Sequence, residues 1–251
     1  MFLTTDSENS MLAIIIIFIS HWYLSLFVQT FFLHRYASHQ MFKTSPFMEK
    51  IFFIFTLIAQ GSSFLRPSAY ALMHRDHHKY SDTNKDPHSP TSFKNIFSFM
   101  IKTANEYKAF TEIAEKRAND KSLPRWDSFE KFADSYICRT LFVLLYISIY
   151  IYFSPYYWLY LLIPVHILMG PLHGFIVNWF GHKVGYRNFD KLHDKSKNTL
   201  FIDFLMLGEL YQNNHHRFPK KNNFAFKWYE IDFGYKIVKL LHKIGIITIT
   251  K

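Results

Sequence analysis

The sequence predicts an all-α integral membrane protein with about three transmembrane helices, one interfacial helix and a cytoplasmic helical cap. Two observations carry this prediction. Charged residues are absent from two long stretches of the chain, and all 29 Lys and Arg residues lie in the segments outside those stretches. Aromatic residues make up 20% of the chain, with 28 Phe among them. Because 251 residues is an ordinary size for one domain, we predict a single domain over residues 1–251.

The first uncharged stretch covers residues 11–33 and contains no Asp, Glu, Lys or Arg. A helix of this length rises about 35 Å, which is enough to cross a hydrocarbon layer of about 30 Å. We therefore predict a transmembrane helix here. The stretch lacks a basic leading region and a small-residue cleavage site, so we expect it to be retained and not removed as a signal peptide.

The second uncharged stretch runs from Thr140 to Gly181 and is much longer than one crossing requires. Ser154 and Pro155 divide it near its middle, and this pair favours a turn. We predict two transmembrane helices, at about residues 140–154 and 156–181.

A shorter apolar run at about residues 51–65 contains Gly61, Ser62 and Ser63. A helix of this run would reach only about 22 Å, which is too short to cross the bilayer. We therefore predict an interfacial segment.

Basic residues give the expected orientation, because loops rich in Lys and Arg stay on the cytoplasmic side. No Lys or Arg precedes Arg35, and none lies between Thr140 and Gly181. Three crossings place both basic segments in the cytoplasm. We expect the N-terminus outside, the C-terminus inside, and the protein in the cytoplasmic membrane of a bacterium.

The net charge of +10 does not by itself indicate a nucleic-acid-binding protein. Basic residues that flank membrane spans are expected from insertion and from contact with anionic headgroups, so we predict no nucleic-acid partner. The single cysteine, Cys138, excludes an internal disulfide and a multi-cysteine zinc or iron–sulfur site within one chain. Any metal must be held by other ligands.

Histidines form clusters at the predicted cytoplasmic ends of the apolar runs. The chain has 14 histidines. The segments HRYASH, HRDHH, NWFGH and QNNHH contribute, in this order, His34 and His39; His74, His77 and His78; Asn178 and His182; and Gln212, His215 and His216.

Spacing gives these clusters a geometry, because residues at i, i+3 and i+4 share one face of a helix. The HRDHH histidines have this spacing, and Gln212, His215 and His216 repeat it. Adjacent residues on a helix point about 100° apart, so each trio could offer two ligands to one metal and a third to its neighbour. Asn178 and His182 also share a face. The eight histidines of the four clusters exceed what one six-coordinate ion accepts, and neutral imidazole suits iron, copper, zinc or nickel. The residues therefore predict two metal ions.

Each cluster alone also has a structural interpretation, as an interfacial helix end, a solvated basic stretch or a polar turn. Four clusters on one predicted membrane face favour metal binding. By contrast, we expect His21, His166 and His173 to be neutral, hydrogen-bonded side chains within the apolar runs, not ligands. Asp86 and His88 are candidates for contacting the metal-binding histidines without binding a metal themselves.

Four ordered segments, HRYASH, HRDHHKYSDTNKDPH, NWFGHKVGYRNFD and GELYQNNHHRFP, resemble the membrane fatty acyl desaturases of the stearoyl-CoA desaturase type. The resemblance covers roughly residues 25–235. In that family, two iron ions (Fe²⁺) are held almost wholly by histidine on the cytosolic side, and oxygen is activated to remove two hydrogens from methylene carbons. The resemblance implies the metal ligands His34, His39, His74, His77, His78, His182, His215 and His216, with Asn178 contacting a metal through water.

One departure from the family concerns Gln212, which stands where stearoyl-type enzymes have the first histidine of the last cluster. An amide oxygen can bind iron weakly or leave a coordination position open. Front-end desaturases are similar to this sequence in having Gln at that position. The stretch QGSSFLRPSAYALM before His74 is also longer than its family counterpart.

The function implied by the resemblance is an oxygen-dependent desaturase that introduces a cis double bond into a fatty acyl chain carried by CoA or by a lipid. The sequence has no haem motif, Gly-rich nucleotide fingerprint or cysteine cluster, so a separate electron donor such as cytochrome b5 or a ferredoxin is implied. One alternative is a membrane di-iron hydroxylase or ketolase acting on a lipid, sterol, carotenoid or alkane. Another is a metal-binding membrane protein without catalysis.

Overall fold

The structure is a computed structural model that describes residues 7–250. The few residues of the predicted outer leader that precede Ser7 lie outside this range. The described chain is mostly helical, in the order α1 (Ser7–Val28), η1 (Gln29–Ser38), β1 (Phe42–Lys43), α2 (Pro46–Gln60), η2 (Gly61–Ser63), α3 (Pro67–Tyr80), η3 (Pro90–Ser92), α4 (Ile96–Lys116), α5 (Asp127–Ala133), α6 (Tyr136–Phe153), η4 (Tyr157–Leu162), α7 (Ile163–Ile167), α8 (Met169–Lys183), η5 (Asp203–Leu205), α9 (Gln212–Arg217), α10 (Phe233–Lys243) and β2 (Thr248–Ile249).

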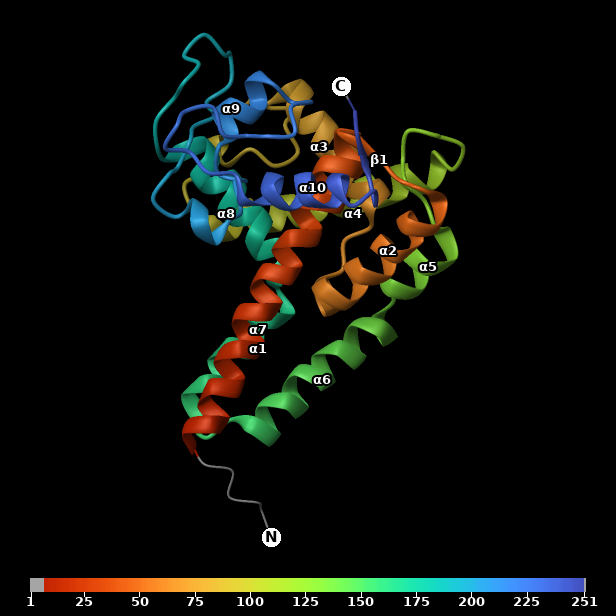
Figure 1. The fold of residues 1–251 in the computed structure, drawn as a ribbon, viewed down its shortest axis with the longest axis vertical. Helices are drawn as coiled ribbons and strands as arrows, with labels where there is room; N and C mark the ends of the chain where they lie inside the picture. The colour runs from red at the N-terminus through yellow and green to blue at the C-terminus, as the bar shows by residue number, and fades with distance from the viewer. Residues whose placement is uncertain (1–6, 251) are drawn as a thin grey trace.

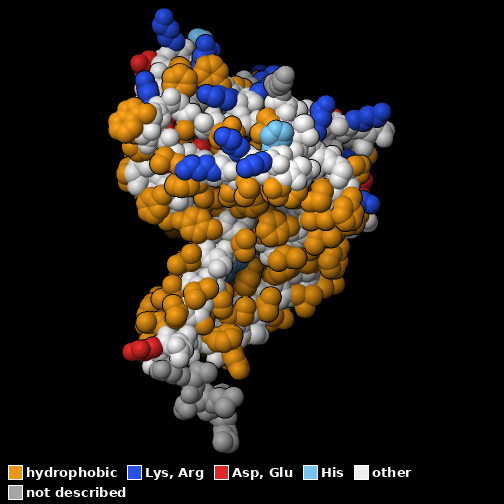
Figure 2. Space-filling model, in the orientation of Figure 1, with side chains coloured by type: hydrophobic (Ala, Val, Ile, Leu, Met, Phe, Trp, Pro, Cys, Tyr) orange, Lys and Arg blue, Asp and Glu red, His pale blue; other side chains and the backbone are white. Residues whose placement is uncertain are grey.

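The helices form a stem and a cap (Figure 1). α1, α6 and α7 make up the stem, which ends near the N-terminus, and α3, α9 and α10 belong to the cap at the opposite end. Apolar side chains cover the stem, whereas Lys and Arg gather on the cap (Figure 2). Ile16 of α1 is 54% exposed and Ile151 of α6 is 66% exposed, as expected for side chains that face lipid.

Two continuous helices are long and apolar enough to cross a membrane, residues 7–38 and α6. Two further helix pairs pass the same test but are bent, α2–η2 with α3 by 78° and η4–α7 with α8 by 74°. The described chain thus has between two and four candidate spans. This confirms the prediction of a mostly helical membrane protein, and the number of crossings, with the interfacial placement of residues 51–65, stays a prediction.

The predicted span at residues 156–181 is not one continuous helix. Its two halves, up to Ile167 and from Met169 onwards, meet at the 74° bend. Pro171 explains the break, because it has no N–H to donate to the carbonyl of Ile167, four residues earlier. The hydroxyl of Ser62 donates to that carbonyl instead, at 3.1 Å. The bend therefore turns α8 away from the stem and towards the cap.

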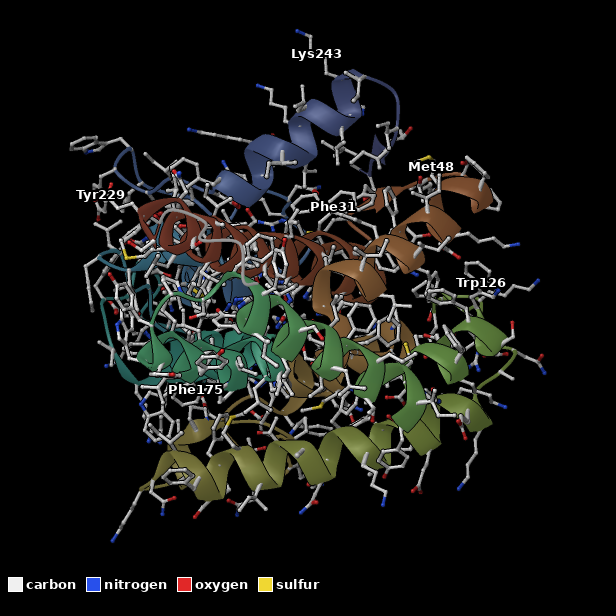
Figure 3. All side chains as sticks on the ribbon, turned by 90° about the horizontal axis from the view of Figure 1, so that it is seen from below. Phe31, Met48, Trp126, Phe175, Tyr229 and Lys243 are labelled. Carbon is white, nitrogen blue, oxygen red and sulfur yellow. The ribbon has the colours of Figure 1, made fainter. Side chains whose placement is uncertain are left out.

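Aromatic packing forms the main core at the junction of stem and cap. Phe31 and Phe32 of η1 pack with Phe52 and Phe53 of α2, and all four are buried. Seen along the stem, Phe31 lies among the packed helices, whereas Lys243 of α10 projects at the periphery (Figure 3). Part of the high Phe content thus serves this core.

The C-terminal segment is fixed to the cap in two ways. β2 pairs antiparallel with β1, with Phe42 opposite Ile249. Asp232 caps α10 by accepting from the backbone N–H of Tyr235 at 2.7 Å. The same carboxylate forms an ion pair with Arg35 at 2.8 Å, and neither side chain is exposed. Since Arg35 lies in η1, the end of the chain is attached to the continuation of the first helix.

Candidate metal centre

The first helix changes its winding where the first histidine cluster begins. η1 is a π-helix, and the backbone N–H of His39 donates to the carbonyl of His34 at 3.2 Å. In an α-helix, residues five apart point about 140° away from each other. A π-helix bonds residues i and i+5, which places them one above the other. The wider turn therefore brings His34 and His39 to the same face.

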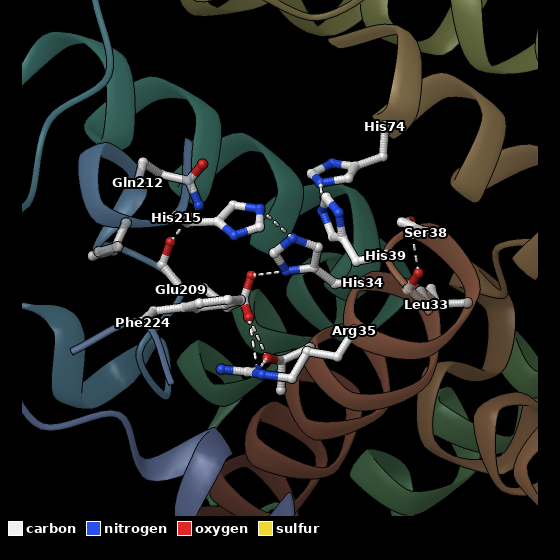
Figure 4. A network of polar contacts seen from close by, with 12 residues as sticks. Leu33, His34, Arg35, Ser38, His39, His74, Glu209, Gln212, His215 and Phe224 are labelled. Carbon is white, nitrogen blue, oxygen red and sulfur yellow. Dashed lines mark hydrogen bonds and ion pairs between the residues drawn. The ribbon is translucent and has the colours of Figure 1, made fainter. Parts of the chain in front are cut away.

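Five histidines from three segments of the chain converge with their Nε2 atoms in one place, His34, His39, His74, His78 and His215. The Nε2 atoms of His34 and His215 lie 2.9 Å apart, as do those of His39 and His74. His78 Nε2 lies 3.0 Å from the Nε2 atoms of both His74 and His215. Figure 4 shows four of these rings pointing towards one another.

These distances fit a shared metal ion better than a set of hydrogen bonds. Five neutral imidazoles whose Nε2 atoms carry lone pairs cannot all satisfy one another, since a lone pair needs a donor. Metal–nitrogen bonds of about 2.1 Å at right angles place neighbouring ligand atoms about 3.0 Å apart. The observed separations of 2.9 to 3.0 Å match that value. The donor set is thus suited to one transition-metal ion.

A second group consists of His77, His182 and His216, whose ligand atoms lie within 4.8 Å of one another. All three side chains are buried or nearly so, and each Nε2 atom is buried without a hydrogen-bond partner among residues 7–250. Buried polar atoms are normally paired, so three unpaired nitrogens in one place call for a ligand. A second metal ion would satisfy all three.

Carboxylates hold the opposite nitrogen of each histidine in the second group. The Nδ1 atoms of His77, His182 and His216 lie 2.9 Å from Asp86, Asp82 and Asp194, respectively. In the first group, Glu209 lies 2.6 Å from Nδ1 of His34. Because a carboxylate only accepts, each Nδ1 must carry the proton, which leaves the Nε2 lone pair free for a metal.

The same contacts keep the carboxylates ionised. Burial alone would raise the pKa of Asp82, but the hydrogen bonds that its carboxylate accepts from His182, from the hydroxyl of Ser89 and from the backbone N–H of Lys195 outweigh burial, and the net pKa lies well below the usual range. Asp194 behaves in the same way through His216. Burial lowers the pKa of His215 well below 6.5, and the neighbouring His34 and His39 add to the effect. The cap thus combines neutral imidazoles with negative carboxylates, which is the combination that divalent metals require.

Gln212 and Asn178, both predicted near the metals, line one cavity with His34 and His74. The side-chain amide of Gln212 donates to the carbonyl of Glu209 at 2.6 Å, and that of Asn178 donates to the carbonyl of Gly174 at 2.8 Å. The cavity has a volume of about 360 Å³.

The other predicted residues lie either beside the second histidine group or in the apolar helices. Asp86 contacts His77 as expected, and His88 lies beside the same ring, with the ring centroids 4.4 Å apart. His21 and His166 contact each other in the stem, 2.6 Å apart through their Nδ1 atoms, and take no part in the metal groups. His173 also lies outside the metal groups, as predicted, but neither of its ring nitrogens has a hydrogen-bond partner in the described chain.

Sequence reasoning missed three residues of the site, Asp82, Asp194 and Glu209. Each holds a histidine by its Nδ1 atom, but only Glu209 and Asp82 lie within the four histidine-bearing segments. A metal-binding histidine usually donates the N–H of its other ring nitrogen to a hydrogen-bond acceptor, and this rule was the signal that the sequence offered. With 19 Asp and Glu in the chain, that rule could not select the partners.

Comparison with known proteins identifies desaturases and an acetylenase among the relatives of this chain. The chain is 29% identical to a hex-5-enoyl-(acyl-carrier protein) acetylenase of Moorena producens (strain JHB), over 91% of this chain and 74% of the relative. It is 29% identical to delta-9 acyl-lipid desaturase 1 of Arabidopsis thaliana, over 87% of this chain and 68% of the relative. It is 26% identical to an sn-1 stearoyl-lipid 9-desaturase of Anabaena variabilis, over 100% of this chain and 88% of the relative.

A family-wide comparison covers nearly the same part of the chain. The model of the fatty acid desaturase family matches residues 9–241, which include both histidine groups and their carboxylates. This match confirms the resemblance drawn from the four histidine-bearing segments. The chain belongs to the fatty acid desaturase family.

Proposed function

We propose that this protein is an oxygen-dependent acyl desaturase that introduces a cis double bond into a fatty acyl chain carried by CoA or by a lipid. The observation that carries the proposal is a cavity whose wall includes histidines of the first group, which lies next to the second group. His34 and His74 of the first group line that cavity, and Asn178 and Gln212 line it beside them. A substrate in the cavity would therefore lie next to the first metal position.

The character of the cavity supports an acyl substrate. Much of its wall is apolar, including Met73, Phe99 and Phe175. Its volume of about 360 Å³ lies within the usual range for ligand pockets. An alkyl chain offers no hydrogen-bonding groups, so it can be held only by shape and by apolar contact. This wall is suited to presenting methylene groups to the histidine groups.

The eight histidines are proposed to hold two iron ions, His34, His39, His74, His78 and His215 at one position and His77, His182 and His216 at the other. When bound, the irons would supply the oxygen activation that removes two hydrogens from an unactivated chain. The residues of this chain do the remaining work. Asp82, Asp86, Asp194 and Glu209 fix the imidazole orientations, and the cavity wall selects the carbons that come within reach.

The reaction also requires electrons from outside the chain, and we propose a small carrier such as cytochrome b5 or a ferredoxin. Lys and Arg gather on the cap that holds the histidines (Figure 2). A basic surface favours encounter with an acidic partner. The same distribution supports a cap that faces the cytoplasm. Fusing a cytoplasmic or a periplasmic reporter enzyme to the C-terminus tests this orientation, and activity of the periplasmic reporter alone would contradict it.

The fatty acids of a host that expresses the protein test the proposed activity. Gas chromatography with mass spectrometry compares the intact protein with His77→Ala, and with His193→Ala as a control at an exposed histidine outside both groups. We expect a new unsaturated acyl species with the intact protein and the control, and none with His77→Ala. No new species from folded protein supplied with a suitable electron donor would refute the proposal.

One feature favours a second candidate function, hydroxylation of the acyl chain. Gln212 repeats the position of a ligand in the His74, His77 and His78 spacing, but its amide nitrogen bonds to the carbonyl of Glu209. A metal with fewer imidazole ligands has more room for oxygen-derived ligands. The same mass spectra decide between the two functions, because hydroxylation would give an oxygenated acyl chain in place of an alkene.

A further inference from the structure

The helix α10 has three different faces. One face carries Gly234 and Val238, which are buried. Val238 belongs to the same core as Phe31 and Phe32 of η1, and α10 contacts η1 directly. Because η1 continues the first candidate membrane span, α10 lies against the end of that span, where the stem meets the cap. The other two faces of α10 are exposed.

An apolar stripe runs along the second face of α10. Phe233, Ile237 and Leu240 follow one another at intervals of four and three residues, and Ile244 continues the series just past the end of the helix. Side chains with this spacing share one side of a helix. Phe233 is 39% exposed, Leu240 is 55% exposed and Ile244 is 58% exposed. An aligned and exposed apolar stripe of this kind marks a surface that contacts another apolar phase.

The third face of α10 is basic. It carries Lys236, Lys239 and Lys243, which are all exposed, and the helix contains no Asp or Glu. At about 100° of rotation per residue, this face lies about 100° from the apolar stripe and points away from the buried face. A Lys-rich face beside an apolar stripe is typical of a helix that lies in a membrane surface, with its apolar side chains among the acyl chains and its ammonium groups at the headgroups.

The place of α10 in the molecule fits such a surface. The helix lies beside the end of α1, in the part of the cap nearest the stem (Figure 1). Seen from below along the stem, α10 lies in open view at the edge of the molecule, and Lys243 projects outward from it (Figure 3). The helix is therefore accessible from the side on which lipid surrounds the stem.

We propose that α10 is an interfacial helix that binds the anionic headgroup layer of the membrane that holds the stem. The apolar stripe enters the acyl region, and the three Lys side chains reach anionic headgroups, which attract basic segments at the membrane surface. Asp232, which caps α10, forms an ion pair with Arg35, the neighbour of His34. Lipid bound by α10 thus fixes the depth of the cap close to the first histidine group. This placement does not depend on the metal ions or on the reaction.

Nitroxide labels on the full-length protein test this placement. Leu240→Cys reports on the apolar stripe, and Lys239→Cys, one residue earlier on a different face, is the matched control; both are made in a Cys138→Ala background. The protein is placed in nanodiscs that contain phosphatidylglycerol, and electron paramagnetic resonance measures collisions of the label with oxygen and with a water-soluble nickel chelate. Oxygen partitions into the acyl region, whereas the chelate stays in water. We expect oxygen to dominate at Leu240 and the chelate to dominate at Lys239.

The lipid composition tests the role of the basic face. We expect the ratio of oxygen to chelate collisions at Leu240 to fall in nanodiscs of phosphatidylcholine alone, and to fall in anionic nanodiscs when Lys236, Lys239 and Lys243 are all changed to Gln. A ratio that changes in neither case would overturn the proposed binding of anionic headgroups.

Two results at Leu240 would overturn the placement itself. Equal access of the chelate to Leu240 and Lys239 would mean that α10 lies in water. Protection of Leu240 from both reagents would mean that a second copy of the chain covers the stripe. Ile244→Cys, on the same stripe just past the helix, replaces Leu240→Cys if that variant fails to fold.

Discussion

Asp82 offers the sharpest test of how the carboxylates tune the second metal position. Its Oδ2 atom accepts from Nδ1 of His182 at 2.9 Å and from the backbone N–H of Lys195 at 2.6 Å. Its Oδ1 atom accepts from the hydroxyl of Ser89. The substitution Asp82→Asn removes the charge and keeps the shape. Asp82 has φ +60, and Asn adopts this left-handed conformation readily, so the exchange adds no backbone strain.

The size of the effect follows from the contact with His182. A hydrogen bond to a charged group contributes about 1.5–3 kcal/mol, and much of that is lost when the carboxylate becomes an amide. Each 1.4 kcal/mol is about a factor of ten in affinity, so we expect iron at the second position to bind about 10–100-fold more weakly. The first position, whose histidines do not contact Asp82, should bind iron as before.

Anaerobic Fe²⁺ titration of the purified protein measures the two affinities. Asp76→Asn is the matched control, because Asp76 lies between the ligand histidines of α3 but makes no side-chain hydrogen bond to any described residue. The control should leave both affinities unchanged. Equal iron affinity in Asp82→Asn and the wild type would show that the negative charge of Asp82, which contacts His182, does not affect iron binding at the second position.

Three other changes have expected outcomes. Gly174→Val should block the acyl cavity, so that product formation falls while two irons remain bound; normal turnover would contradict the assigned cavity. Burial raises the pKa of Glu130 from 4.5 to about 7, so wild-type stability should fall by up to about 3 kcal/mol as the pH rises across that range. Glu130→Gln should therefore melt higher than the wild type at pH 8 and equally at pH 4.5, and a difference independent of pH would refute this. Asp232→Ala removes one of the two carboxylates that pair with buried Arg35 and leaves Glu209 as the other, so it should destabilise the protein by about 1.5–3 kcal/mol in thermal scans; an unchanged melting temperature would refute the contribution of the buried pair.

The sequence predicted the helical membrane fold and the histidine clusters because both depend on local patterns. Hydropathy gave the first helix near residues 11–33, which the structure extends to residues 7–38. Spacing placed His74, His77 and His78 on one helix, as found. It also allowed two ligands from such a trio for one metal and a third for its neighbour, and the structure places His74 and His78 in one group and His77 in the other. Neighbouring histidines on a helix diverge enough to serve two positions.

Other features could not be predicted because they depend on contacts between distant segments. Nothing in HRYASH indicates a π-helix, and without it His34 and His39 would point apart. Pro171 explains the bend before α8 once the structure is known. The carbonyl of Ile167 that this bend leaves without its helical partner is satisfied by Ser62, more than a hundred residues away, and the sequence does not show this contact. The partners of His182 and His216 come from loops whose course only the folded chain reveals.

The histidine groups also join the membrane stem to the cap. His34 lies on the continuation of α1, His74 on α3 and His215 on α9, so the first group forms only when segments far apart in sequence have met. Arg35, next to His34, binds Glu209 and Asp232 in the cap. Metal bound by such a group stabilises the assembled state over any state in which the segments are apart. The energy of metal binding is therefore also energy of folding, and it acts where the apolar stem meets the polar cap.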